Sequence, residues 1–101
     1  MDDHELRRIE QMVKAAEDLY VELPRERIVP EPYLDQIEKE YILDKYGTLR
    51  VWKCRDDDGK RFVVIVYEWQ FYRYEWEEKE EAWAIARQLQ ARLRILNRLL
   101  G

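Results

Sequence analysis

The sequence contains no serine, one histidine and one cysteine. Because His4 and Cys54 lie far apart and serine is missing, Ser–His and Cys–His catalysis are excluded. Zinc needs three or four suitable ligands, so we expect no metal site, and we expect no other cofactor. A lone cysteine cannot form an internal disulfide, which suits a reducing compartment.

Long hydrophobic runs are also missing. The longest, Phe62–Tyr67, is far too short to span a membrane, and the charged N-terminus lacks the apolar segment of a signal peptide. We therefore expect a cytoplasmic protein, in the host cytoplasm if the gene is viral, with no membrane partner. The net charge of −4 is not typical of a general nucleic-acid binder, which usually carries a basic excess.

Only three glycines and three prolines occur, which favours long regular elements. The hydrophobic fraction of 47% is enough to fill one core, and 101 residues leave no room for two. We predict a single α+β domain over residues 1–101. In it an antiparallel β-hairpin is packed by an amphipathic N-terminal helix, a short second helix and a long C-terminal helix.

The first helix is predicted to begin at Asp2 or Asp3, because Asp2 and Glu5 have the spacing of a capping box. Pro24 would end it, since proline cannot continue the helical hydrogen bonds. The apolar stripe follows steps of three and four residues through Leu6, Ile9, Val13, Ala16, Tyr20 and Leu23.

A second helix is predicted over residues 33–46. Pro32 suits its first position, and Gly47 is a natural C-terminal cap. Leu34, Ile37 and Tyr41 supply its apolar stripe. Residues 41–43 could instead be extended, which would make this segment a turn followed by a strand.

The strongest local pattern predicts a hairpin of residues 48–55 and 60–74 around the turn Asp56–Gly59. Gly59 would adopt the left-handed conformation of a bulge turn. The resulting register pairs Leu49 with Tyr67, Val51 with Ile65, Trp52 with Val64 and Cys54 with Phe62. Both faces are apolar, so the hairpin needs helices on both sides, or helices on one side and another chain on the other. A break near Glu68 would make a third strand.

The last helix is predicted from about Trp76 to Leu100. Its apolar residues step by four and three alternately, as in a helix-pairing seam, through Ala82, Ala86, Leu89, Leu93, Leu96 and Leu100. This seam and the two-faced hairpin present more apolar surface than a domain of this size needs. We therefore expect self-association, as a homodimer.

Six of the ten residues from Tyr67 to Trp76 are aromatic. Alternation assigns Tyr67, Trp69 and Phe71 to the core face, and the later rings to the opposite face. Tyrosine, tryptophan and arginine are enriched at binding hot spots, so that second face is a candidate docking surface. The alternative is that the first or second helix covers it. The predicted partner-binding residues are Glu68, Gln70, Tyr72, Arg73, Tyr74 and Trp76.

Without a catalytic signature, we expect a non-catalytic module that binds a protein partner and regulates or inhibits it. Short acidic chains with an aromatic hairpin occur among phage-encoded inhibitors. The most specific form of the hypothesis is therefore a phage or mobile-element inhibitor of a host nucleic-acid-processing machine.

Two alternatives remain open. The first is nucleic-acid binding by the arginines of the last helix together with aromatic stacking. These arginines are Arg87, Arg92, Arg94 and Arg98. The second is a small enzyme that uses Glu68 and Glu75 as an acid–base pair.

Overall fold

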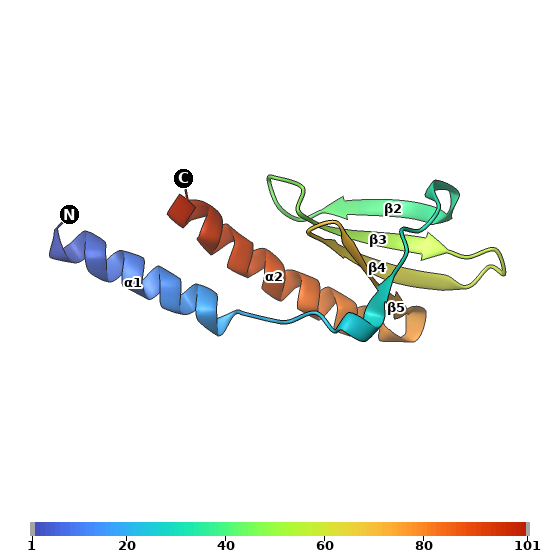
Figure 1. Ribbon diagram of the computed structural model, residues 1–101, viewed down its shortest axis with the longest axis horizontal. Helices are drawn as coiled ribbons and strands as arrows, with labels where there is room; N and C mark the ends of the chain where they lie inside the picture. The colour runs from blue at the N-terminus through green and yellow to red at the C-terminus, as the bar shows by residue number, and fades with distance from the viewer. Residues whose placement is uncertain (1, 101) are drawn as a thin grey trace.

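The computed structural model describes residues 2–100 and has an α+β fold: an N-terminal helix, a five-stranded antiparallel sheet and a long C-terminal helix (Figure 1). The elements are α1 (Asp3–Asp18), β1 (Ile28–Val29), β2 (Ile37–Ile42), β3 (Leu49–Arg55), β4 (Arg61–Tyr67), β5 (Gln70–Glu75) and α2 (Lys79–Leu100). Short 3₁₀ turns lie at Arg25–Arg27, Leu34–Gln36 and Trp76–Glu78. The strand order is β1-β5-β4-β3-β2, so the sheet has more strands than the two or three predicted.

Helix α1 begins as predicted. The Asp2 carboxylate accepts a hydrogen bond from the Glu5 backbone N–H at 2.8 Å, which satisfies one of the free donors of the first turn. The helix ends at Asp18, before the predicted stop at Pro24. The residues that follow carry Leu23 into the core under the sheet, which a continued helix would not do.

The β3–β4 hairpin has the predicted register at every pair, from Leu49 opposite Tyr67 to Cys54 opposite Phe62. Gly59 has a φ of 82°, the left-handed conformation expected for this turn. The Asp56 carboxylate accepts hydrogen bonds from two backbone N–H groups of the turn, those of Asp58 and Lys60. The chain also breaks at Glu68, so that β5 forms the anticipated third strand.

The predicted helix over residues 33–46 is wrong. A 3₁₀ turn at Leu34–Gln36 is followed by strand β2, which pairs antiparallel with β3. Helical and strand periodicities are hard to separate over so short a segment. Pairing with β3 gives the backbone of β2 a partner, and Tyr41 then lies on the same face as Val51 opposite it.

Helix α2 covers one face of the sheet. The core between them is formed by Leu49, Val51, Val63, Ile65, Tyr72, Tyr74, Ala82, Ala86 and Leu89, together with Leu23. On α2 these positions continue the stripe predicted from the sequence, and alanines at 82 and 86 allow the helix to approach the strands closely.

The opposite face is closed by the chain itself. Strands β1 and β2 lie at the two edges of the sheet, so residues 30–36 cross it, and they do so on the face that α2 leaves free (Figure 1). Four strand spacings of about 4.8 Å make roughly 19 Å, and seven extended residues reach roughly 24 Å. A second cluster is buried on this face: Trp52, Cys54, Phe62, Val64 and Val66, with Ile37 and Phe71 at its border. The prediction that helices or another chain must cover this face is therefore wrong.

The molecule is elongated, with principal extents of 59 × 21 × 19 Å. Helix α1 lies antiparallel to the second half of α2, and this pair projects beyond the strands (Figure 1). We call α1 and residues 90–100 of α2 the helical arm, and the five strands with residues 79–89 of α2 the sheet body. Neither helix among the described residues has the length and apolar character needed to cross a bilayer.

Candidate functional site

Two of the predicted partner-binding rings are buried. Tyr74 is fully enclosed and Tyr72 is only 8% exposed, because both point from β5 into the core beneath α2. Their exposure on a docking surface was therefore a wrong prediction. Burial raises the pKa of both hydroxyls. The Tyr72 hydroxyl donates to Gln70 Oε1 at 2.8 Å, whereas the Tyr74 hydroxyl has no hydrogen-bond partner within residues 2–100.

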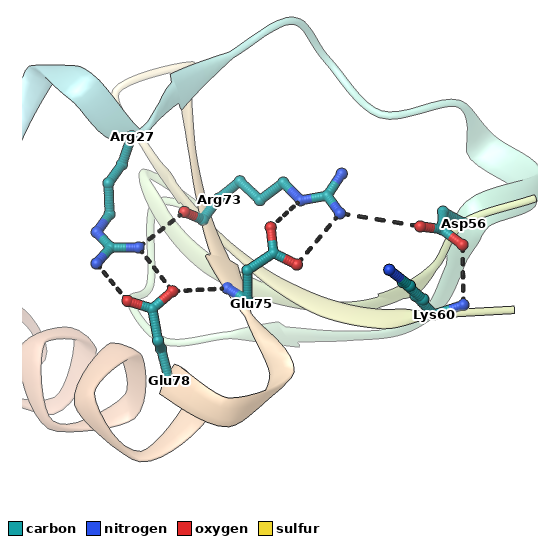
Figure 2. A network of polar contacts seen from close by, with 6 residues as sticks. All are labelled: Arg27, Asp56, Lys60, Arg73, Glu75 and Glu78. Carbon is teal, nitrogen blue, oxygen red and sulfur yellow. Dashed lines mark hydrogen bonds and ion pairs between the residues drawn. The ribbon is translucent and has the colours of Figure 1, made fainter. Parts of the chain in front are cut away.

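Arg73 is committed to contacts within the chain (Figure 2). Its Nε donates to Glu75 Oε1 at 3.0 Å, and its guanidinium lies 3.9 Å from the centre of the Phe62 ring. A weaker ion pair of 4.0 Å reaches Asp56 in the β3–β4 turn. Arg73 thus covers the second cluster of the sheet, which leaves less of its charge for a partner.

The turn between β4 and β5 presents an aromatic ring that was predicted to be core. Trp69 is 69% exposed, and it lies between the exposed residues Glu68 and Gln70. Glu68 and Trp69 have φ values of 51° and 64°, a left-handed conformation that is costly for residues with a side chain. The guanidinium of Arg50 lies 5.6 Å from the Trp69 ring.

The two carboxylates of the enzyme alternative are not brought together. Glu68 lies in the turn before β5 and Glu75 at the far end of that strand, and both are exposed. The six residues of β5, which ends in Glu75, correspond to about 20 Å, too far for a shared proton or substrate. Within residues 2–100, no three His, Cys, Asp or Glu side chains gather as metal ligands would.

The four arginines of the nucleic-acid alternative divide between two flanks of α2. Arg92 faces α1, where its Nε donates to the Ala16 carbonyl at 3.1 Å. Arg87 lines one hollow between α2 and the sheet, while Arg94 and Arg98 line another. Residues 87, 94 and 98 share a helix face because they are separated by seven and eleven positions.

Three aromatic rings line the hollow at Arg87. It has a volume of about 860 Å³, and we call it the aromatic groove. Tyr41 enters it from β2, Trp76 from the turn before α2 and Trp83 from α2. The rings of Tyr41 and Trp83 pack edge to face, with centroids 5.0 Å apart. The lining residues are Tyr41, Lys53, Trp76, Lys79, Glu80, Trp83 and Arg87.

Cations surround the three rings of the groove. Lys39 and Lys53 lie 4.9 and 5.7 Å from the centre of the Tyr41 ring. Lys79 and Arg61 lie 4.5 and 5.3 Å from Trp76, and Arg87 lies 5.9 Å from Trp83. The ion pairs formed within residues 2–100 involve none of these five cations.

The charge in the groove affects the phenol at its centre. The ammonium group of Lys39, and after it that of Lys53, lowers the pKa of the Tyr41 hydroxyl. An anion placed beside this hydroxyl would therefore meet two ammonium groups and an O–H donor.

A second hollow of about 650 Å³ follows along the same border between β2 and α2. Lys45, Arg94 and Arg98 supply its positive charge, and Asp44 is its one carboxylate. Between the two hollows, Gln90 donates to the Leu43 carbonyl at 3.0 Å and holds α2 against the end of β2. The basic border thus runs along α2 from Lys79 to Arg98, about 28 Å at 1.5 Å per residue.

The sequence pattern singles out only two residues of the aromatic groove as candidate binding residues, Trp76 and Arg87. Tyr41 was assigned to a helix, and Trp83 was passed over beside the leucine ladder of α2. A helical wheel would have placed Trp83 on the same face as Arg87 and Arg94, away from Ala82 and Leu89. The neighbouring lysines gave no signal in the sequence, because the strand pairing of β2 with β3 brings Lys39 opposite Lys53.

The comparisons with known proteins give no match: no family model fits the chain, and neither a curated protein nor a solved structure is significantly similar to it.

Proposed function

We propose that this protein binds single-stranded nucleic acid in the aromatic groove. One observation carries the proposal: three partly buried aromatic rings line a groove with Lys53, Lys79 and Arg87, and two further cations lie over these rings. None of the five cations makes an ion pair within the described chain. This combination of stacking surface and free positive charge is typical of proteins that bind single strands.

The rings would provide the larger part of the binding energy. A base stacked on an aromatic side chain contributes about 1–3 kcal/mol and needs an unpaired, splayed nucleotide. Trp76 and Trp83 keep part of their surface in solvent, and the long side chains over them can move aside because water is their alternative partner. A duplex would offer phosphates to the groove but no free base faces.

The cations would hold the phosphates that flank the stacked bases. The net charge of the whole chain is −4, so attraction is confined to the basic border and is weak elsewhere. With three or four phosphates engaged, the slope of log K against log salt for a single strand should be about −2 to −3. A general polyanion binder would give a steeper slope.

Fluorescence anisotropy with a labelled oligothymidylate of about twelve nucleotides tests the proposal at ~50 and ~200 mM salt. Wild-type protein should bind at low salt and quench tryptophan fluorescence. The double variant Lys79→Gln/Arg87→Gln should bind at least about tenfold more weakly, as loss of two phosphate contacts predicts. Absence of any binding at ~50 mM salt, where attraction is strongest, would refute the proposal.

Two matched controls separate the groove from general charge. Arg7→Gln/Arg8→Gln removes the same charge from the exposed face of α1 and should leave affinity nearly unchanged. Trp76→Leu should reduce the quenching, leaving only that of Trp83, whereas Trp69→Leu should retain it in full because Trp69 lies outside the groove. If both charge variants lose affinity equally, or if duplex binds as well as single strand, the groove is not a single-strand site.

A protein-binding role is our second proposal, and one observation favours it. The left-handed backbone at Glu68 and Trp69 holds a tryptophan in solvent, and such strain is often kept for function. In this version of the regulator or inhibitor hypothesis, Trp69 with Glu68 and Gln70 would contact the partner, in place of Tyr72 and Tyr74. A partner that binds wild type and the Trp69→Gly variant equally well would exclude it.

A further inference from the structure

We propose that two copies of this chain associate through their helical arms to form a four-helix bundle. The proposal does not depend on nucleic-acid binding, because it uses α1 and the end of α2 and none of the rings of the aromatic groove.

The arm has almost no interior of its own. Within α1, Ala16 is the only buried side chain, and no residue of α2 beyond Leu89 is buried. The two helices are held by few polar contacts, such as Gln88 Nε2 donating to the Leu19 carbonyl at 3.2 Å. Two isolated helices of this length are marginal in water unless an apolar face is covered.

Apolar side chains remain in solvent on both helices of the arm. Leu6 and Val13 of α1 are 47% and 41% exposed, and they share one face because they are seven positions apart. On α2 the stripe that packs on the sheet continues with Leu93 and Leu96, which are partly buried, and ends at Leu100. Its exposure rises from 2% at Leu89 to 86% at Leu100.

The charge of the arm favours a second copy as the occupant. Residues 2–18 carry six acidic and three basic side chains, whereas residues 90–100 of α2 carry three arginines and no acid. Within residues 2–100, none of these charges forms an ion pair between the two helices. A surface with one acidic and one basic strip is complementary to itself after a twofold rotation.

In the bundle, α1 of each copy would lie against the second half of α2 of the other. Leu6 and Val13 would then cover the half-buried Leu96 and the exposed Leu100 in α2 of the other copy, and the acidic residues of α1 would approach that copy's arginines. Helices of 16 and 22 residues are long enough for such packing, which is usual for antiparallel four-helix bundles.

Light scattering coupled to size-exclusion chromatography tests the proposal. At about 50 µM chain, where a micromolar dimer is mostly associated, we expect twice the mass of one 12.5 kDa chain. Leu6→Glu/Val13→Glu should give the mass of one chain, because it places charge in the interface. The matched control Tyr33→Glu/Leu34→Glu alters two exposed apolar residues of the crossover and should stay dimeric.

A charge variant separates loss of the dimer from loss of the fold. Glu10→Lys/Glu17→Lys replaces two exposed acids without touching the apolar stripe, and it should weaken the dimer by making both helices basic. Circular dichroism of each variant should match the wild type. A wild-type protein that stays monomeric at 50 µM and at tenfold higher concentration overturns the proposal. A Leu6→Glu/Val13→Glu protein that remains dimeric also overturns it, because the interface then lies elsewhere.

Discussion

The sheet body and the helical arm enclose their apolar residues differently. In the sheet body, α2 closes one face and the crossover of residues 30–36 closes the other, so that both faces of β3 and β4 are buried. In the arm, Ala16 is the only buried side chain of α1, and residues 90–100 of α2 contain none. A sheet with two apolar faces needs a layer of chain on each face, and this chain supplies both layers. A pair of helices needs further helices against its outer apolar face, and the described residues supply none.

This difference predicts unequal costs for core substitutions. Phe62→Ala, on the crossover face, should lower the free energy of unfolding by about 3–5 kcal/mol, the usual cost of removing a buried ring. Leu96→Ala in the arm should cost about 1 kcal/mol in dilute solution, because its side chain is only partly buried. Urea unfolding followed by circular dichroism measures both.

If Phe62→Ala costs no more than Leu96→Ala, residues 30–36 do not close the second face, and the sheet body is as open as the arm. Leu34→Ala is a useful reference because its side chain is exposed on the crossover itself and should be nearly neutral.

The sheet body also contains a strained turn, which the arm does not. Replacing Glu68–Trp69 by Asn–Gly, the pair that this two-residue hairpin turn prefers, should raise the free energy of unfolding by about 1–2 kcal/mol. The contact of Trp69 with Arg50 is lost, which limits the gain. Gly59→Ala, at the φ of 82° in the other hairpin, should change stability in the opposite direction.

No gain from the Asn–Gly pair would mean that the turn is not strained. A stabilised variant that still binds every partner of the wild type would mean that the strain is not kept for binding.

Removal of a single hydroxyl from the core of the sheet body should have a smaller effect on stability. Tyr74→Phe should raise the free energy of unfolding by about 1 kcal/mol, because it removes a buried hydroxyl that lacks a hydrogen-bond partner. Tyr72→Phe should lower it slightly, since the Tyr72 hydroxyl donates to Gln70. Thermal unfolding of the two variants, which differ only in which oxygen is removed, shows whether the signs are opposite.

The sequence predicted those parts of the fold that depend on local pattern. The β3–β4 register followed from one turn and from alternation, and the start of α1 from the cap at Asp2. Strand β2 was given only as the alternative to a helix because its identity depends on pairing with β3, and β1 was missed because two residues show no pattern. The turn at Glu68–Trp69 lacks the glycine or asparagine that would mark it.

The candidate site was less predictable than the fold. The three rings of the aromatic groove come from β2, the turn before α2 and α2 itself, and no spacing in the sequence relates Tyr41 to Trp83. Alternation placed Tyr72 and Tyr74 together on one face correctly, but it could not show that α2 covers that face. Exposure depends on which element packs there, which is a tertiary property.

The junction between the arm and the sheet body provides the smallest predicted effect, a dependence on pH. The Arg27 guanidinium, which donates to Glu78 Oε1 at 3.0 Å, lowers the pKa of the Glu78 carboxyl below its usual 4.5, and the Glu75 backbone N–H adds to this (Figure 2). A carboxyl with a lowered folded-state pKa contributes stability above pH 4.5, and that contribution is lost as pH falls through the folded-state pKa.

The wild type should therefore lose stability below pH 4.5 more steeply than Glu78→Gln. Glu77→Gln, a neighbouring carboxylate outside these ion pairs, should follow the wild type. The free energy of unfolding is measured against pH between pH 3 and 7. If it changes with pH in the same way for the wild type and Glu78→Gln, the Arg27–Glu78 ion pair does not stabilise the fold.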